Sequence, residues 1–191
     1  MKYLNRELKG TFGYIRKQTV FEIIKTIILF AMAVGLFMIG YVTLGTRRSL
    51  WSVFAVLSLL PASKSLVGVI MLLRYRSLTE SEYEKISSVI AGIPAIYENI
   101  LTTESKAYYV PVICCMASTV IAYYPGQKGS TDELKQHLEN VMSNAGHKAS
   151  VRIFDDEDDF LDRASEMKEK LSSDKDAVSY SILATIKAVS L

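Results

Sequence analysis

Residues 26–46 read TIILFAMAVGLFMIGYVTLGT, and residues 49–73 read SLWSVFAVLSLLPASKSLVGVIMLL. The first stretch carries no charged side chain, and the second carries only Lys64. At ~1.5 Å per residue each stretch would form a helix of about 30 Å or more, which matches the hydrocarbon core of a bilayer. The two stretches, joined by a tight turn at Arg47 and Arg48, therefore predict a transmembrane helical hairpin.

Charge divides the chain into two unlike halves. Up to Arg76 there are 11 Lys or Arg and 2 Asp or Glu, a net +9, and from Ser77 onward there are 11 and 18, a net −7. A basic region beside the spans suits an anionic lipid surface, so the lipid bilayer is one expected partner. The acidic half argues against nucleic acid as a partner, because phosphate contacts require a cationic surface.

The flanking charges also predict the orientation of the hairpin. Six Lys or Arg precede residue 26, and Arg74, Arg76 and Lys85 follow residue 73, whereas the turn between the spans holds only Arg47 and Arg48. Positive charge is retained on the cytoplasmic side, so we expect a two-span protein of the cell membrane with both termini in the cytoplasm.

We expect three parts: a basic amphipathic juxtamembrane segment over residues 1–19, the transmembrane hairpin over residues 20–76, and a cytosolic α/β domain over residues 77–191. The leader predicts an interfacial helix, with a solvated basic tail as the alternative. Small residues four apart, Ala31 and Gly35 in the first span, predict the face on which the hairpin packs. On the second span the corresponding residues are Ser58, Ala62 and Ser65.

Lys64 follows Pro61 near the middle of the second span, where a lysine is costly to insert. One interpretation is a kinked helix that lines a polar cavity, with Lys64 as an anion or proton site. The favoured interpretation is structural: Lys64 extends toward the cytoplasmic face, with Glu22 of the first span as a candidate intramembrane partner.

The soluble half begins with a capping box, Thr79 and Glu82. Apolar spacing predicts helices over 80–91 and 94–101, followed by a β-hairpin within 107–124 that turns near Ala117–Ser118. Pro111 favours an edge position for the first of these strands. A helix from Ser130 to near Gly146, a strand over 149–154, a helix opened by Asp155 or Asp156, and a last helix over 177–189 complete the order α-β-β-α-β-α-α, an α+β class with a small mixed sheet.

The strands on either side of the middle helix should be parallel, so the loops after them should share one sheet edge. One loop carries Lys128, Gly129 and Ser130, which could hold a phosphate; the other carries Asp155, Asp156 and Asp158, which could hold Mg²⁺. Aspartates at a helix start are also what capping favours. We favour that structural interpretation and assign no catalytic residue and no required cofactor.

Cys114 and Cys115 are adjacent in a predicted strand, a geometry that strains a disulfide. We expect reduced thiols, which fit a cytosolic domain.

Four stretches carry a family resemblance: residues 2–30, residues 41–51, LLPASKSL at 59–66 and VRIFDDEDDF at 151–160. They resemble an uncharacterised family of small two-span membrane proteins of Gram-positive bacteria, some of which are labelled glycosyltransferase-like. The resemblance implies the architecture and a bacterial source, and it carries no catalytic residues to this chain.

The leading hypothesis is a non-enzymatic membrane-anchored protein that presents its acidic domain for self-assembly, as a homo-oligomer, or for binding of a protein partner. One alternative is a membrane-bound enzyme or sensor of a phosphorylated ligand, a nucleotide or sugar nucleotide, at Lys128 and the Asp155–Asp159 cluster. A second alternative is an oligomeric transport accessory that uses Lys64.

Overall fold

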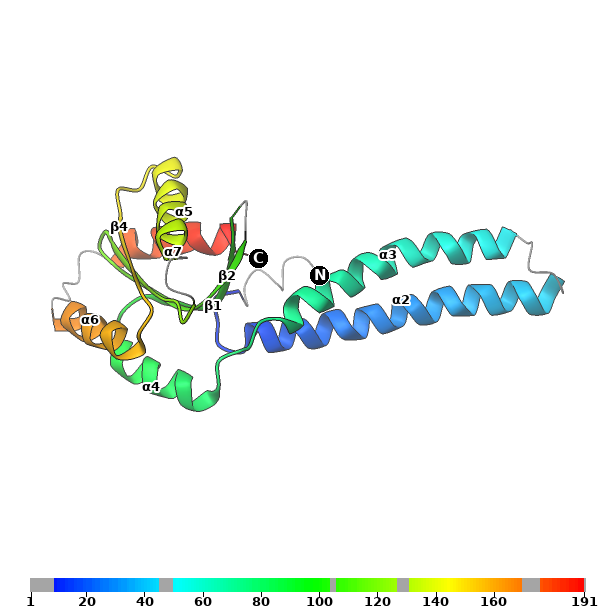
Figure 1. The fold of residues 1–191 in the computed structure, drawn as a ribbon, viewed down its shortest axis with the longest axis horizontal. Helices are drawn as coiled ribbons and strands as arrows, with labels where there is room; N and C mark the ends of the chain where they lie inside the picture. The colour runs from blue at the N-terminus through cyan, green and yellow to red at the C-terminus, as the bar shows by residue number, and fades with distance from the viewer. Residues whose placement is uncertain (1–8, 45–49, 104–105, 127–130, 170–175, 191) are drawn as a thin grey trace. The chain divides into compact units, whose positions relative to one another are not determined.

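A computed structural model describes residues 9–44, 50–103, 106–126, 131–169 and 176–190. The chain forms two compact units. One comprises Ile15–Arg76, and the other combines Met1–Tyr14 with Ser77–Leu191. The predicted coarse architecture, two long apolar helices followed by a small α/β region, is confirmed (Figure 1).

The first unit is a pair of antiparallel helices, α2 (Tyr14–Leu44) and α3 (Leu50–Leu73), which lie side by side (Figure 1). Both are long and apolar enough to cross a membrane. Helix α2 begins 12 residues before the apolar stretch, because Ile15–Lys25 continues the helix without a break. Pro61 lies inside α3, and the helix runs through it.

Small residues at seven-residue intervals line the contact between these helices. Within the apolar stretches the buried residues are Thr26, Ala33 and Gly40 on α2 and Ala55, Ala62, Ser65 and Val69 on α3, which confirms the prediction for Ala62 and Ser65. A seven-residue repeat keeps one seam of each helix facing the other. The expectation for Ala31 is wrong, since Ala31 is exposed: it lies two residues, or about 200° around a helix of 3.6 residues per turn, from Ala33.

The second unit is a four-stranded sheet with helices on both faces. Its strands are β1 (Ala95–Thr102), β2 (Ala107–Met116), β3 (Thr119–Tyr123) and β4 (Ser150–Phe154), in spatial order β1-β2-β3-β4. The β1–β2 and β2–β3 pairs are antiparallel, and the β3–β4 pair is parallel. The sheet is therefore mixed, as predicted.

Two separate apolar cores lie on the two faces of this sheet. Helices α5 (Thr131–Asn144) and α7 (Asp176–Val189) cover one face, and α4 (Glu80–Ile90) and α6 (Glu157–Glu169) cover the other (Figure 1). The first core includes Leu138 and Ile186, and the second includes Ile86 and Phe160, all at most 1% exposed. Burial on both faces explains why the strands are almost continuously apolar rather than alternating.

Several local predictions are confirmed. The capping box of Thr79 and Glu82 starts α4, with the Thr79 amide donating to Glu82 Oε2 over 2.8 Å. The β2–β3 hairpin turns at Ala117–Ser118, and Ala117 takes a left-handed φ of 55°. Asp156 opens α6, and the β3–α5–β4 unit joins two parallel strands.

The predicted helix over 94–101 is wrong, because these residues form β1. The order of the soluble half is therefore α-β-β-β-α-β-α-α. The spacing of Ile93, Tyr97 and Ile100 imitates a helical seam, but the segment is rich in β-branched and aromatic residues and finds a partner strand in β2. Since β1 takes the edge, Pro111 lies in an interior strand, which also corrects the edge assignment of β2.

Pro111 is tolerated in this interior strand because the side chains of β1 and β2 switch from one face of the sheet to the other beside it. Ile96 and Leu101 of β1 lie in the same core although strict alternation would place residues five apart on opposite faces. On β2, Val110 and Val112 lie in opposite cores although they are two apart. The change occurs at Glu98, whose φ is 51°, and at Pro111, which has no N–H to donate to the ladder.

The N-terminal segment packs on the globular unit. Lys9–Gly13 are turns and bends, so the predicted interfacial helix does not include them; residues 1–8 lie outside the described part of the chain. The Tyr97 amide donates to the Gly10 carbonyl over 2.9 Å, and the Phe12 ring stacks on Tyr83 at 4.2 Å. This segment thus covers part of the outer edge of β1.

We predict that Phe12→Ala destabilises the globular unit. Loss of a stacked ring costs on the order of 1 kcal/mol, which should raise the rate of thiol labelling at the buried Cys114 and Cys115 about fivefold to tenfold. The measurement is reaction of the detergent-solubilised chain with a chromogenic disulfide. Lys148→Ala, at an exposed position, is the control. Equal rates for Phe12→Ala and the unmodified chain would contradict the packing role of this segment.

Candidate functional site

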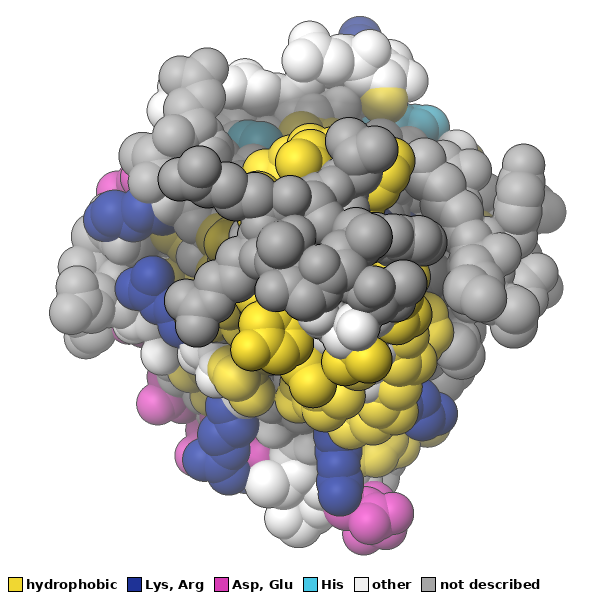
Figure 2. Space-filling model, turned by 90° about the vertical axis from the view of Figure 1, so that its right-hand side faces the viewer, with side chains coloured by type: hydrophobic (Ala, Val, Ile, Leu, Met, Phe, Trp, Pro, Cys, Tyr) yellow, Lys and Arg dark blue, Asp and Glu magenta, His cyan; other side chains and the backbone are white. Residues whose placement is uncertain are grey.

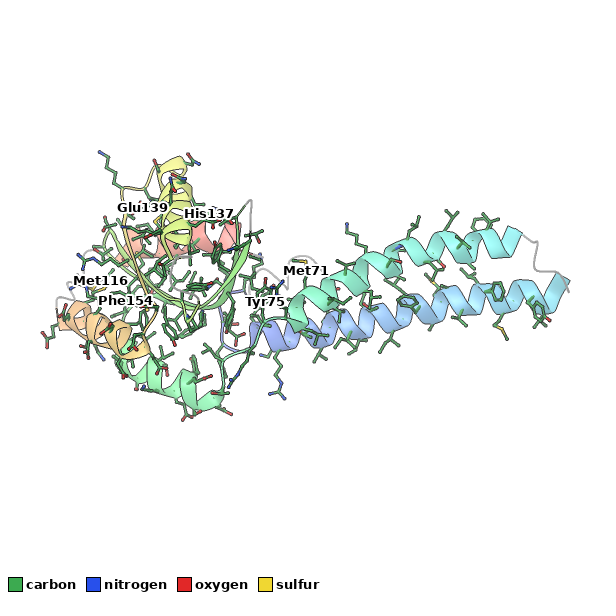
Figure 3. The ribbon with its side chains drawn as sticks, viewed as in Figure 1. Met71, Tyr75, Met116, His137, Glu139 and Phe154 are labelled. Carbon is green, nitrogen blue, oxygen red and sulfur yellow. The ribbon has the colours of Figure 1, made fainter. Side chains whose placement is uncertain are left out.

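The carboxyl ends of β3 and β4 lie side by side, as the parallel connection predicts. Tyr123 pairs with Phe154 in the sheet, and the Tyr124 amide donates to the Phe154 carbonyl over 2.8 Å. Phe154 is labelled at this end of β4 in Figure 3. Gly126 and Asp155 therefore leave the sheet at one edge. The expected phosphate-binding residues Lys128, Gly129 and Ser130 lie outside the described residues.

The acidic cluster forms a helix cap. Asp156 Oδ1 accepts from the Asp158 amide over 2.8 Å and from the Asp159 amide over 3.3 Å, which satisfies two N–H groups at the start of α6. Among the described residues no group of three or more His, Cys, Asp or Glu is placed to hold a metal ion. The Mg²⁺ site at Asp155, Asp156 and Asp158 stays a prediction.

Lys85 of α4 faces this helix start, a contact that sequence reasoning missed. Its Nζ lies 2.7 Å from Glu157 Oε1 and 3.5 Å from Asp158 Oδ1. The hydrogen bond to Glu157, together with attraction to both carboxylates, raises the pKa of Lys85. The ammonium therefore stays charged and ties α4 to α6 at an exposed position. The signal for this contact in the sequence is a single lysine, Lys85, in a helix whose other charged residues are glutamates.

In the hairpin, Glu22 belongs to a polar cluster at the helix contact. Thr26 Oγ1 donates to Ser65 Oγ over 2.8 Å, and Ser65 Oγ donates to Glu22 Oε2 over 3.3 Å. Glu22 forms its ion pair with Lys25, and its side chain is 15% exposed. Lys64 lies on the exposed surface of α3, adjacent to buried Ser65, so the structure pairs Glu22 with Lys25 rather than with Lys64.

Two neighbouring residues of β1 hold the two chain segments that lead to the hairpin. The Tyr97 amide binds the Gly10 carbonyl before α2. Glu98 is 1% exposed; its Oε1 accepts from the Ser77 hydroxyl and, over 3.1 Å, from the Leu78 amide after α3. Sequence reasoning missed this role because it assigned β1 to a helix.

Asn99, the next residue of β1, is 2% exposed, and neither amide atom of its side chain has a hydrogen-bond partner within the described chain. A buried amide without partners is costly, so this position weakens the core rather than strengthening it.

The two cysteines are free, and both are fully buried in β2. Burial raises the pKa of both thiols, that of Cys115 to about 11. A thiol that stays protonated and buried is a poor nucleophile. The structure thus agrees with their interpretation as strand residues.

Helix α7 exposes an apolar surface that sequence reasoning described only as a loose face. Outside the hairpin, the exposed large hydrophobic side chains among the described residues are Val178, Tyr180 and Val189, all on this helix. Between them runs an exposed stripe of small residues, Ala177, Ser181, Ala184 and Ala188, opposite the buried Ile182 and Ile186. We call these seven residues the α7 face.

Comparison of the chain with protein-family models, with curated proteins and with solved structures gave no match.

We predict that Asp156→Ala lowers the free energy of unfolding by about 1 kcal/mol, because the α6 start loses its cap. Asp158→Asn should leave it nearly unchanged, since that side chain is 85% exposed and makes only a long ion pair. Chemical denaturation of the full chain in detergent measures both. Millimolar Mg²⁺ should not shift either midpoint; a Mg²⁺-dependent stabilisation that Asp158→Asn abolishes would establish the metal site instead.

Proposed function

We propose that this protein is a non-enzymatic membrane anchor whose hairpin spans the bilayer and whose globular unit associates with a second copy of the chain through the α7 face. The observation that carries the proposal is the distribution of exposed apolar side chains. Among the described residues, the exposed large hydrophobic side chains are confined to α2, α3 and α7.

The hairpin surface supports the membrane part of the proposal. Figure 2 shows hydrophobic side chains gathered on the surface at the side of the hairpin. Exposed residues such as Ile27, Phe37 and Leu60 are between 42% and 68% accessible. Continuous apolar surface of this extent is uncommon on soluble monomers and suits lipid tails as the surrounding medium.

The charge distribution supports a cytoplasmic location of both termini. More Lys and Arg residues lie before the first apolar stretch and after the second than between them, where there are only Arg47 and Arg48. The free, buried thiols of the globular unit are compatible with a reducing compartment.

The chemistry of the α7 face favours a second copy as its occupant. Residues at 177, 181, 184 and 188 share one side of the helix, and their small side chains permit close approach of another helix. Asp176–Val189 contains only Asp176 and Lys187 as charged residues, whereas the half of the chain after Arg76 carries a net −7. Two copies would meet with least charge repulsion at this nearly neutral helix.

Membrane anchoring would assist such association. Two chains held in one bilayer meet at a far higher effective concentration than free domains, so a modest interface suffices. The same surface patch would serve both copies, as in a two-fold symmetric dimer.

One observation favours the alternative function, a sensor or enzyme for a phosphorylated ligand. The loops after β3 and β4 leave the sheet at one edge, which is where open α/β sheets place their ligands. That function requires a ligand-dependent role of Asp158, which the denaturation experiment above examines.

We predict that Ala184→Cys forms a disulfide-linked dimer when membranes containing the full chain are treated with copper–phenanthroline. Ala184 lies at the centre of the α7 face, so the two thiols would come within bonding distance. Native Cys114 and Cys115 are buried and should not react. Dimer is measured on a non-reducing gel.

Glu139→Cys is the matched control for this experiment. Glu139 is exposed on α5 and is labelled in Figure 3. It should yield at most one tenth of the dimer that Ala184→Cys yields. Comparable yields at the two positions, or no dimer at Ala184, would contradict association through the α7 face. A crosslink of Ala184→Cys to a different protein would identify another occupant.

For topology, we predict that a membrane-impermeant maleimide labels Glu139→Cys only after cells are permeabilised. The flanking positive charges hold the globular unit inside the cell. Labelling is followed as a mass shift of the full chain on a gel. Efficient labelling in intact cells would show the opposite orientation.

A further inference from the structure

A hydrogen bond fixes the register of the two hairpin helices. Thr26 Oγ1 lies 2.8 Å from Ser65 Oγ, and because the helices are antiparallel, Lys25 and Lys64 lie on opposite sides of this contact, within about 3 Å of one level along the hairpin. Sequence alone places Lys64 near the middle of its span. Measured against α2, it lies level with the first residues of the uncharged stretch.

The hairpin helices extend for unequal lengths on the two sides of the level of Lys25 and Lys64. From Lys25 to the end of α2 at Leu44 the helix rises about 29 Å, close to the ~30 Å thickness of a hydrocarbon core. Beyond Lys64, α3 continues for nine residues to Leu73, a further ~14 Å. The whole of α2, 31 residues or about 46 Å, exceeds the core by half its thickness.

The hairpin can therefore sit at two depths. In the shallow position the hydrocarbon boundary lies at Lys25 and Lys64. In the deep position it lies near Leu73, which places both lysines and Glu22 inside the hydrocarbon.

The free energy of moving side chains from water into hydrocarbon favours the shallow position. The unfavourable insertion free energy of a lysine or carboxylate at the bilayer centre is roughly five to ten times the favourable insertion free energy of one apolar side chain. The deep position would gain eight exposed apolar side chains: Val20, Phe21, Ile24, Leu66, Val67, Ile70, Met71 and Leu73. It would also insert three ionisable groups, of which only Glu22 and Lys25 form an ion pair.

We infer that Lys25 and Lys64 bind the phosphate groups of lipid headgroups and so set the depth of the hairpin at this level. This inference rests on the proposed membrane anchoring. Lys64 is exposed, and the Lys25 side chain is 42% exposed while it contacts Glu22. An ammonium has three donors, so Lys25 can contact a phosphate while it keeps its carboxylate partner. The last two turns of α3 then lie in the headgroup layer and the water beyond it.

Tryptophan quenching in vesicles tests this depth. The full chain with its single tryptophan removed, Trp51→Phe, receives either Leu59→Trp or Leu73→Trp and is reconstituted into phosphatidylcholine–phosphatidylglycerol vesicles with brominated acyl chains. Leu59 lies five residues before Lys64, on the hydrocarbon side of the shallow boundary, and Leu73 ends α3. We expect strong quenching at position 59 and less than one third of it at position 73. Equal quenching at the two positions would overturn the inference.

A second pair of variants tests the role of Lys64 itself. In the Leu73→Trp chain, Lys64→Leu removes the charge that holds the depth, so quenching at position 73 should at least double. Ser63→Leu, at the neighbouring exposed position, should leave it unchanged. No change with Lys64→Leu, or the same change with both variants, would overturn the role of the lysine.

Flotation of the vesicles separates this inference from the anchoring proposal. A chain that floats with the vesicles and is quenched equally at positions 59 and 73 refutes the depth alone. A chain that stays in the protein fraction refutes the anchor and the depth together.

Discussion

The arrangement of the globular unit depends on the hydrogen bonds that the buried carboxylate of Glu98 accepts. It lies where β1 and β2 change face, and it accepts hydrogen bonds from the chain that arrives from α3. Its neighbour Tyr97 binds the chain that leads into α2. A left-handed backbone at a glutamate is costly, and a buried carboxylate is costly unless its oxygens are bonded. These costs are tolerated because one short piece of strand organises both connections to the hairpin.

The two units use different physical means to remain folded. The globular unit buries two apolar cores on the faces of its sheet, so the hydrophobic effect in water supports it. The hairpin contact includes Thr26, Ala33 and Gly40 of α2 and Ala55, Ala62, Ser65 and Val69 of α3. Such small side chains bury little area, and they suit a medium in which close packing and hydrogen bonds rather than water exclusion join helices. The composition of the hairpin contact is thus itself an argument for lipid surroundings.

Much of the fold follows from local signals in the sequence. The capping box of α4 and the Asp156 cap depend on residues two or three positions apart, and the β3–α5–β4 crossover follows the general rule for parallel strands joined by a helix; the sequence predicts all three. Failures arose where the pairing of one element with another, rather than the pattern within a segment, decides the structure. β1 is a strand because β2 lies beside it, and the hairpin seam follows a seven-residue repeat that becomes evident only when both helices are paired. The Glu98 contacts and the α7 face likewise depend on tertiary placement. The loop with Lys128 lies outside the described residues.

The contact of Lys9 with the Ser190 carbonyl, 2.7 Å long, joins residues 181 positions apart. A ribosome must therefore make nearly the whole chain before this bond has a partner, while the two apolar helices emerge early. The core that contains Ile182, Leu183 and Ile186 of α7 is likewise incomplete until the last helix has been synthesised. Synthesis consequently imposes an order: the two apolar helices are made first, and the sheet closes afterwards, after a slow search for contacts of large sequence separation.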